Sequence, residues 1–469
     1  MGRESRKSER TIREPKKIVL SLSKKNIVIR AIIAGTCLIL GALLIAHSCS
    51  NMGDKTGDLT INYPTFTNKN SETQVLFDNN IDVNYYYSDD TSDKEEVVNK
   101  INNSLNEMIE YHKLLDYNDL YQNNGTDIHN LKYINDHPNV WIKVDLKLFN
   151  VLKMAEELRN NTDGKYSIFS GKLYEVWANI IDDYYMFGMN LDTIKSIDPL
   201  YNEDIQHKIN DIVNSINNEN TKIEFNDNTL EVKFVVLDED KKNIVLDLGL
   251  LESSYLIDNL KARMMSEKLY NGTITSSTGM VATLGDNVEK GYHQINSVSL
   301  QSVYNNSLIF DYSFAYYGAR NGMIFNPFLE IKFHSYLSNK SPYYYFFDNN
   351  NIVIRSLIIN SKSGYSDFSV HSSFIYSSEL TLSNQLVDNY NLYFNQENDY
   401  GYNYLLKYEN SNKTGAIVIY NNGNTNIGIN SATTLLYSTL MNDYFDEKYI
   451  PYIKVSKVVK TKIVATKGD

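Results

Sequence analysis

The chain has 469 residues, a mass of 54.0 kDa and a formal net charge of −12 at pH 7. This length is enough for one large domain or two. The acidic balance, without a basic stripe in the middle of the chain, argues against broad nucleic-acid binding by the body, and we expect no nucleic-acid partner.

The N-terminus has the features of a membrane anchor. Residues 1–30 are strongly basic, and residues 31–47 contain no Asp, Glu, Lys or Arg and are mostly apolar. A membrane-spanning helix needs about 20 such residues, with a lower limit of about 17. The positive-inside rule predicts a cytoplasmic tail at 1–30, a transmembrane anchor or signal segment at 31–49, and a body on the extracytoplasmic side of the cell membrane.

A lipoprotein is the alternative, with cleavage before Cys49 and lipidation of that residue. The sequence Ala46-His47-Ser48-Cys49 is a poor cleavage signal, and the long basic region also favours an uncleaved anchor. Cys37 and Cys49 are the two cysteines of the chain, so the body has neither a disulfide framework nor a cysteine nucleophile. Its histidines form no zinc-binding pattern.

Residues 50–74 are polar and predict a linker, and residues 75–469 predict a globular domain. At the start of this domain, Val75–Phe77 and Ile81–Tyr87 suggest a hairpin. Asp93–Leu115 has the apolar spacing of a helix. Its stripe consists of Val97, Ile101, Leu105, Ile109 and His112, and we expect His112 to be a core residue.

Further elements follow in the first half of the domain. A second helix is expected from a cap at Asp145 to about Arg159, and a turn at Thr162–Gly164. Residues 195–235 combine a polar helix with a hairpin around Asn226–Asn228, followed by a strand at Glu231–Leu237.

One stretch combines a strand, a turn and the start of a helix. The apolar run Ile244–Leu246 ends at Asp247 and Gly249, and helical spacing begins behind the candidate caps Ser253 and Ser254. We expect this helix to end at Asn271-Gly272. A helix N-terminus can hold an anionic group, although such a junction is also common without a ligand.

The C-terminal half is rich in short alternating segments, which predict antiparallel strands. A helix is expected at Ser377–Leu392, and Val455–Thr466 is a basic, β-prone tail. Sparse helices and dense strands indicate the α+β class. The expected strands are Ser297–Val303, Leu308–Phe314, Phe328–Phe333, Ile352–Ile359, Phe368–Phe374 and Gly415–Tyr420.

Several separated segments share the register of one known family. Thr162–Trp177 has the spacing of T-D-G-x-F-D-P-T-x-x-P-L-x-x-x-W, and Asp247–Asp258 matches D-L-G-G-I-A-K-G-Y-A-V-D without a gap. Leu357–Tyr365 lies where that family has H-I-I-D-P-R-T-G-Y, and Glu379 and Ser383 lie at the Asp and Thr of A-D-A-L-A-T-A-L. The chain resembles the FAD:protein FMN transferases, the ApbE-type flavin transferases.

The resemblance implies an ApbE-like α+β fold with antiparallel sheets and flanking helices behind the membrane anchor. It also implies a Mg²⁺-dependent transferase that takes FAD as substrate, transfers FMN to a Ser or Thr of an exported partner protein, and releases AMP. A metal would neutralise pyrophosphate oxygens while carboxylates and backbone amides orient the ligand.

The family motifs also imply roles for individual residues. Asp258 and Asn360 are the candidate catalytic residues. Glu252, Glu379 and Ser383 are the candidate metal ligands. The candidate cofactor-binding residues are Asp247, Gly249, Tyr255, Thr278, Gly279 and Ser341.

Departures from the family motifs leave a second hypothesis open. Glu252 stands where the family has Ala, Thr278 replaces a glycine, and Leu357 replaces a His and cannot act as acid or base. The i, i+4 spacing of Glu379 and Ser383 would still place both on one helix face. The alternative to an active transferase is a catalytically inactive member that acts as a binding or structural module at the cell surface.

Overall fold

The structure is a computed structural model that describes residues 63–85, 91–188, 190–285, 295–304, 308–317, 321–332, 337, 341–348, 351–366, 370–394, 413–421, 425–431, 437–440 and 454–455. All of them belong to one compact unit, Asp58–Asp469. The predicted tail at 1–30, the predicted anchor at 31–49 and Cys49 lie outside the described residues. In the part of the chain that is described, no helix is long and apolar enough to span a membrane.

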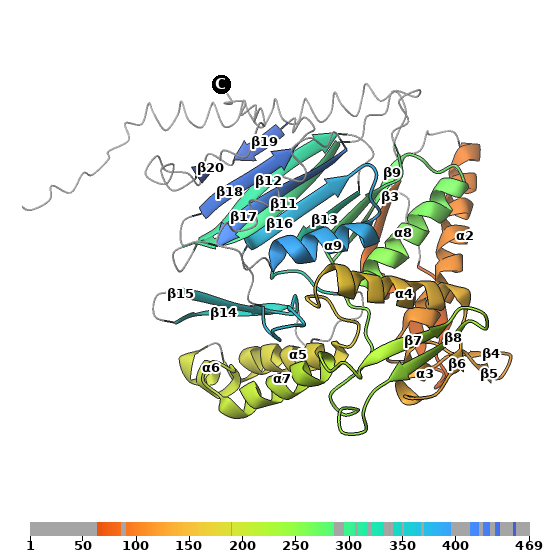
Figure 1. Ribbon diagram of the computed structural model, residues 1–469. Helices are drawn as coiled ribbons and strands as arrows, with labels where there is room; N and C mark the ends of the chain where they lie inside the picture. The colour runs from red at the N-terminus through yellow and green to blue at the C-terminus, as the bar shows by residue number, and fades with distance from the viewer. Residues whose placement is uncertain are drawn as a thin grey trace, which may run out of the picture. The chain divides into compact units, whose positions relative to one another are not determined.

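An eight-stranded sheet forms the largest element of this unit (Figure 1), with the strand order β20-β18-β17-β16-β13-β10-β9-β3. Neighbouring strands are antiparallel, except that β18 and β20 are parallel. The strands are β3 (Ile81–Tyr85), β9 (Gly272–Ser276), β10 (Met280–Thr283), β13 (Asn321–Phe325), β16 (Val370–Ser377), β17 (Thr414–Asn421), β18 (Thr425–Ser431) and β20 (Lys454–Val455).

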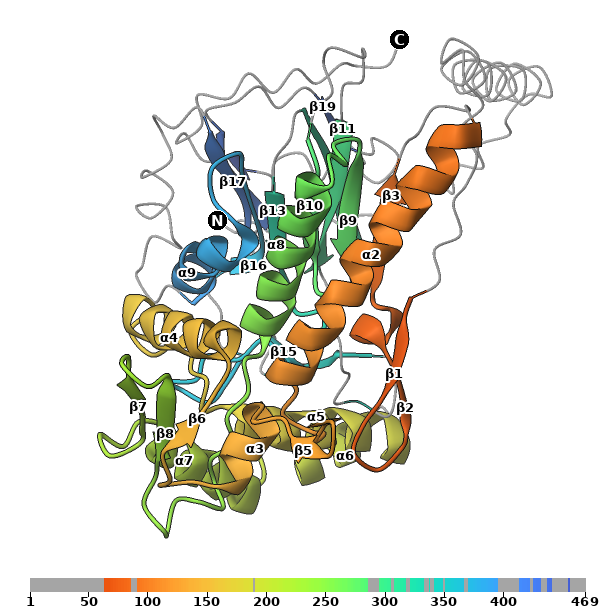
Figure 2. The ribbon, with the colours of Figure 1, turned by 90° about the vertical axis from the view of Figure 1, so that its right-hand side faces the viewer.

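Three helices accompany this sheet: α2 (Thr91–Leu115), α8 (Leu250–Ser266) and α9 (Leu382–Tyr393). Helix α8 lies between the other two and contacts both, and α9 packs on β13 and β16. Figure 2 shows α2 and α8 running beside each other along the sheet. The N-termini of α8 and α9 carry most of the predicted site residues, so this helical layer positions them.

A second layer is built around helix α5 (Gly171–Phe187). This helix contacts α6 (Leu191–Ile197), α7 (Glu203–Ile216) and the hairpin of β14 (Tyr343–Asp348) and β15 (Asn351–Ser356). The other elements are α3 (Leu131–Asp136), α4 (Leu146–Asn161), η1 (Leu76–Asn79), β1 (Thr65–Thr67), β2 (Thr73–Val75), β4 (Gln122–Asn123), β5 (Thr126–Asp127), β6 (Ile142–Lys143), β7 (Lys222–Asn226), β8 (Glu231–Val235), β11 (Ile295–Tyr304), β12 (Leu308–Tyr317) and β19 (Tyr437–Leu440).

One continuous hydrophobic core joins the two layers. It includes Leu105 of α2, Trp177 of α5, Leu260 of α8 and Leu386 of α9, which are all fully buried. Trp177 also donates a hydrogen bond from its indole nitrogen to the carbonyl of Gly364, at 2.8 Å. The α+β class with antiparallel sheets and flanking helices is confirmed.

Local signals located α2 and α4 correctly, whereas α5 was not predicted. Helix α2 has Ile101, Leu105 and His112 on its buried face, so His112 is a core residue as predicted. Asp145 caps α4 by accepting a hydrogen bond from the backbone N–H of Lys147 at 2.8 Å. The hairpin of β7 and β8 also forms where it was expected.

Several predicted elements are wrong because partners distant in sequence decide them. β2 pairs with β1 and β3 pairs with β9, so Val75–Phe77 and Ile81–Tyr87 form no hairpin with each other. β1 also lies within the segment that was predicted to be a linker.

The boundaries of α8 and α9 also differ from the prediction. Helix α8 begins behind Gly249, not behind Ser253 or Ser254, and it ends at Ser266, since Gly272 already belongs to β9. Helix α9 begins behind the cap Thr381 because the preceding residues continue strand β16 as far as Ser377.

Candidate functional site

The start of α8 is held by a tight turn between the two layers. The backbone N–H of Asp247 donates to the carbonyl of Ile168 at 2.7 Å, and Oδ1 of Asp247 accepts from the N–H of Gly249 at 2.8 Å. Gly249 has φ 53° and ψ −131°, and a Cβ atom on it would lie 3.2 Å from the hydroxyl oxygen of Tyr174. The turn therefore requires glycine both for its dihedral angles and for its close neighbour.

Asp247 is fully buried and forms an ion pair with Lys332. Oδ2 of Asp247 lies 3.0 Å from Nζ of Lys332, and the two side chains are 0% and 1% exposed. The same ammonium lies 3.4 Å from the ring centroid of Tyr117, which is the geometry of a cation–π contact. The predicted ligand-binding carboxylate is thus tied to a lysine of the chain itself.

The first turns of α8 hold the other predicted residues of this motif. Glu252 is 2% exposed, and the hydroxyl of Ser254 donates to the carbonyl of Leu251 at 3.0 Å. Tyr255 is half-buried and lies 6.1 Å from the ring of Tyr111 on α2; burial raises the pKa of Tyr255, assisted by the charge of Tyr111. Tyr255 therefore faces α2.

Asp258 connects α8 to the N-terminus of α9. Its carboxylate accepts hydrogen bonds from the backbone N–H groups of Leu382 and Ser383, both at 2.9 Å, and from the Ser383 hydroxyl at 2.8 Å. A carboxylate at a helix N-terminus satisfies unpaired amides and interacts favourably with the helix dipole. Burial raises the pKa of Asp258, and the hydrogen bonds from Ser383 and Leu382 oppose that shift.

The three predicted metal ligands have separate surroundings in the structure. Glu379 precedes α9, is exposed and pairs with Lys413, so the expected shared helix face with Ser383 is wrong. The Ser383 hydroxyl donates to Asp258, and Glu252 lies six residues before Asp258, about 9 Å along the helix axis. Among the described residues, no group of three or more His, Cys, Asp or Glu side chains could hold a metal ion.

Thr278 and Gly279 form the turn between β9 and β10. Thr278 is buried, and its hydroxyl lies 2.7 Å from that of Ser276. Gly279 has φ 76°, and a Cβ atom there would lie 2.5 Å from a methyl carbon of Leu329. Gly279 is thus required by close packing, while the Thr278 hydroxyl is used within the turn.

Asn360 organises a turn that contacts the other family motif. Its side-chain oxygen accepts from the N–H of Lys362 at 3.0 Å, and its carbonyl accepts from the N–H of Gly364 at 2.7 Å. The neighbouring Ser361 hydroxyl accepts from that of Ser170 at 2.8 Å. These contacts give Asn360 a turn-forming role in the structure.

The N-terminus of α5 lies next to both Asp247 and the turn at Asn360. A Cβ atom on Gly171, next to Ser170, would lie 3.0 Å from Cβ of Asp247, so the turn at Asn360 and the start of α8 share the N-terminus of α5 as a neighbour. Ser341 belongs to another contact: its hydroxyl lies 2.7 Å from that of Tyr185 on α5.

Sequence reasoning missed Lys332 and Tyr117. Lys332 lies in Phe328–Phe333, a run that was expected to be a strand, whereas its described residues, 328–332, form turns and bends. A lysine inside an apolar run was the available signal, since lysine is rarely buried unless it is paired. The alternation was instead attributed to a sheet face.

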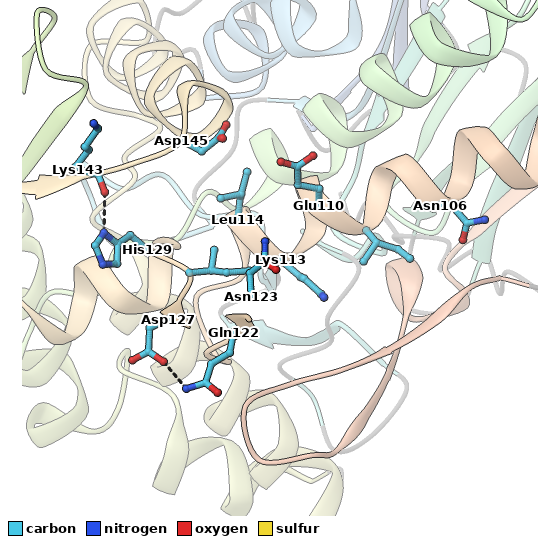
Figure 3. A pocket seen from close by; sticks show the side chains of 12 residues that line it. Asn106, Glu110, Lys113, Leu114, Gln122, Asn123, Asp127, His129, Lys143 and Asp145 are labelled. Carbon is cyan, nitrogen blue, oxygen red and sulfur yellow. Dashed lines mark hydrogen bonds between the residues drawn. The ribbon is translucent and has the colours of Figure 1, made fainter. Parts of the chain in front are cut away.

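A polar cavity of about 620 Å³ lies beside the C-terminal half of α2 (Figure 3). Glu110 and Lys113 of α2, His129 and Asp127 contribute to its walls, and His129 Nδ1 lies 2.8 Å from the carbonyl oxygen of Lys143. None of the predicted site residues lines this cavity.

Comparison with known proteins finds a family model that matches part of the chain. Residues 79–303 match the model of the ApbE family. Over these residues the chain is similar to the ApbE family. Seven of the predicted site residues fall inside the matched ApbE segment: Asp247, Gly249, Glu252, Tyr255, Asp258, Thr278 and Gly279. Among curated proteins, none matches this chain.

Solved structures similar to this chain include ApbE proteins. The ApbE protein of Thermotoga maritima is 15% identical, with a TM-score of 0.48 over 76% of this chain and 94% of its own. The flavin transferase ApbE of Vibrio cholerae is 13% identical, with a TM-score of 0.48 over 79% and 97%. The flavinyl transferase ApbE of Pseudomonas stutzeri, in its apo form, is 13% identical, with a TM-score of 0.45 over 82% and 98%.

Proposed function

We propose that this protein is a flavin transferase that moves FMN from FAD to a Ser or Thr hydroxyl of a partner protein and releases AMP. The observation that supports this proposal is the ApbE family match over 79–303, which contains the stretch from Asp247 to Asp258. That stretch forms the turn and the N-terminal turns of α8.

The reaction forms one bond and breaks another at the phosphorus of the FMN half. The acceptor hydroxyl oxygen bonds to that phosphorus, the bond to the bridging pyrophosphate oxygen breaks, and AMP leaves with that oxygen. The proton of the hydroxyl passes to a base or to solvent. Positioning and charge neutralisation dominate such phosphoryl chemistry.

We assign Asp258 and Asn360 positioning roles in this reaction. Asp258 sets the start of α9 through Leu382 and Ser383, and Asn360 shapes the turn that contacts Ser170. No step is assigned to a metal ion, because Glu379 pairs with Lys413 and the Ser383 hydroxyl donates to Asp258. The test below therefore compares the reaction in Mg²⁺ with the reaction in EDTA.

A non-catalytic module is the second candidate, and specific observations favour it. Asp247 is neutralised by Lys332 in the core, and Glu379 is paired with Lys413 at the surface. Leu357, which stands where the family motif has a His, is 2% exposed. A protein with these features could retain flavin binding without turnover.

The proposed location follows from the N-terminal sequence. With the basic tail at 1–30 in the cytoplasm and the anchor at 31–49, the transferase body lies outside the membrane, and its acceptor is an exported protein. FAD would have to be present in the same compartment.

The test uses the full-length chain purified in detergent. It is incubated with FAD, in Mg²⁺ or in EDTA, and assayed for flavin binding by fluorescence and for AMP by chromatography. When no partner protein is present, water takes the place of the acceptor hydroxyl at the FMN phosphorus, so a transferase releases AMP together with free FMN. Asp258→Ala removes the carboxylate that binds the N-terminus of α9, and we expect it to lower AMP release by about tenfold or more.

Two further results separate the candidates. Glu379→Ala is expected to leave AMP release unchanged. A loss of AMP release in this variant would support the prediction that Glu379 is a metal ligand. Flavin binding without AMP release would favour the non-catalytic module. If FAD neither binds nor is cleaved, the transferase proposal fails.

A further inference from the structure

The ammonium group of Lys332 lies beside Asp247, just before the start of α8. We propose that the Lys332 ammonium is a built-in cation at Asp247, which fills this position permanently and makes it independent of any divalent metal ion. The proposal concerns Lys332 as a positioning residue and does not depend on turnover.

The geometry surrounds the ammonium with favourable partners. Nζ of Lys332 lies 3.0 Å from Oδ2 of Asp247 and 3.4 Å from the ring centroid of Tyr117. Ile331, the residue before Lys332, is 3% exposed, and Lys332 itself is 1% exposed. An ammonium removed from water to this degree requires such compensation, because desolvation of an isolated charge is very unfavourable.

The carboxylate of Asp247 has both oxygens engaged. Oδ1 accepts from the N–H of Gly249 at 2.8 Å, and Oδ2 contacts Lys332. A magnesium ion needs oxygen ligands at about 2.0 to 2.1 Å and near-octahedral geometry, so it would have to displace one of these contacts. The fixed positive charge next to it would also repel a second cation.

Glu252 adds a second acidic residue to this region. It is 2% exposed and lies in the first turn of α8, so the start of this helix contains two buried carboxylates within a few residues. Lys332 offsets one of them without an external ion. Of the predicted metal ligands, Glu379 pairs with Lys413 and the Ser383 hydroxyl donates to Asp258.

The test measures thermal unfolding of the full-length chain in detergent, in EDTA or in MgCl₂ or MnCl₂, at matched ionic strength. Wild type is expected to show no divalent-specific shift in Tm. Lys332→Ala removes the ammonium and is expected to lower Tm by roughly 6 to 10 °C. At about ten times its Kd, a divalent ion that binds Asp247 in this variant would restore roughly 3 °C.

Two further variants make the test specific. Lys332→Ala/Asp247→Asn removes the carboxylate as well and is expected to lose the divalent response. Lys69→Ala is the matched control, because Lys69 and Asp127 form a lysine–aspartate pair of similar length, 2.9 Å, at side-chain exposures of 37% and 31%. This control is expected to show no divalent response.

Several outcomes would overturn the proposal. These are a divalent-specific rise in the Tm of wild type by about 3 °C or more, no response in Lys332→Ala, or an equal response in the double variant. If Lys332→Ala does not fold, the wild-type measurement alone still decides, since an open divalent site would raise its Tm.

A flavin measurement extends the test and rests on the proposed function. The Kd of wild type for FAD is expected to agree within twofold between EDTA and Mg²⁺. A Kd that Mg²⁺ lowers tenfold would contradict a built-in cation. Absence of FAD binding in both conditions would count against the transferase and leave the Tm test of Lys332 intact.

Discussion

Asp198 and Arg355 show how a single buried pair can hold two segments together. Asp198, which follows α6, is fully buried and accepts from Nε of Arg355 at 2.9 Å, from its Nη2 at 3.0 Å and from the Tyr344 hydroxyl at 2.7 Å. The guanidinium also lies 5.5 Å from the Trp177 ring centroid. These contacts fix the β14–β15 hairpin on α5 and α6.

Removal of one partner from this pair should be severe. Arg355→Met leaves Asp198 buried without its cation, and we expect the free energy of unfolding to fall by about 3 to 5 kcal/mol. Urea unfolding measures the change. The matched control is Lys362→Met, which breaks the exposed pair with Asp163 and should change stability by about 0.5 kcal/mol or less. Equal effects of both variants would contradict the assignment.

The raised pKa of Asp258 predicts that its contribution to stability falls as pH rises. Burial raises its pKa above the ordinary 3.8. Between 3.8 and the raised value, the folded chain retains a proton that the unfolded chain has released, so this carboxyl lowers the free energy of unfolding as pH rises through that range. Asp258→Asn should remove this contribution.

The measurement is the difference in unfolding free energy between wild type and Asp258→Asn, followed from pH 3.8 upward. The control is Asp163→Asn, because a hydrogen bond from Lys362 lowers the pKa of Asp163. The pH window of this control lies below 3.8, where wild type should lose stability relative to Asp163→Asn as pH falls toward the lowered pKa. If the two differences in unfolding free energy change in the same direction with pH, the assignment of a raised pKa to Asp258 is wrong.

At the scale of elements, the start of α8 depends on a glycine. Gly249→Ala should destabilise the protein by about 1 to 3 kcal/mol, since its backbone conformation is unfavourable for alanine and the methyl group would press on Tyr174. Gly125→Ala is the control: Gly125 has φ 78°, but nothing lies within 4 Å of its added Cβ atom. A larger cost at Gly125 would contradict the role of the Tyr174 contact.

Helices were predictable where the residues that determine them lie within the helix itself. The cap at Asp145 and the apolar stripe of α2 lie within their own helices, so sequence spacing located both. The pairing of β3 with β9 and the bent path of residues 328–332 depend on partners far along the chain, and no local pattern specifies them.

At the scale of the whole molecule, the N-terminus predicts where the protein resides. In a bacterial host we expect the chain to sediment with membranes and the body to be digested by protease added to spheroplasts, because residues 31–49 are apolar and residues 1–30 basic. Intact mass of the membrane form supplies the second readout. A diacylated Cys49 at the mature N-terminus would contradict the uncleaved anchor.

The sequence by itself determined the α+β class and the register of Asp247–Asp258, since periodicity, capping and motif spacing are local properties. It also correctly predicted that His112 is a core residue, because an apolar helical stripe indicates which side is buried. The tertiary structure decided what the charged residues contact. Asp247 meets Lys332, and Asp258 meets Ser383, across 85 and 125 positions of the chain. Such contacts depend on packing and desolvation in three dimensions, which no local sequence pattern specifies.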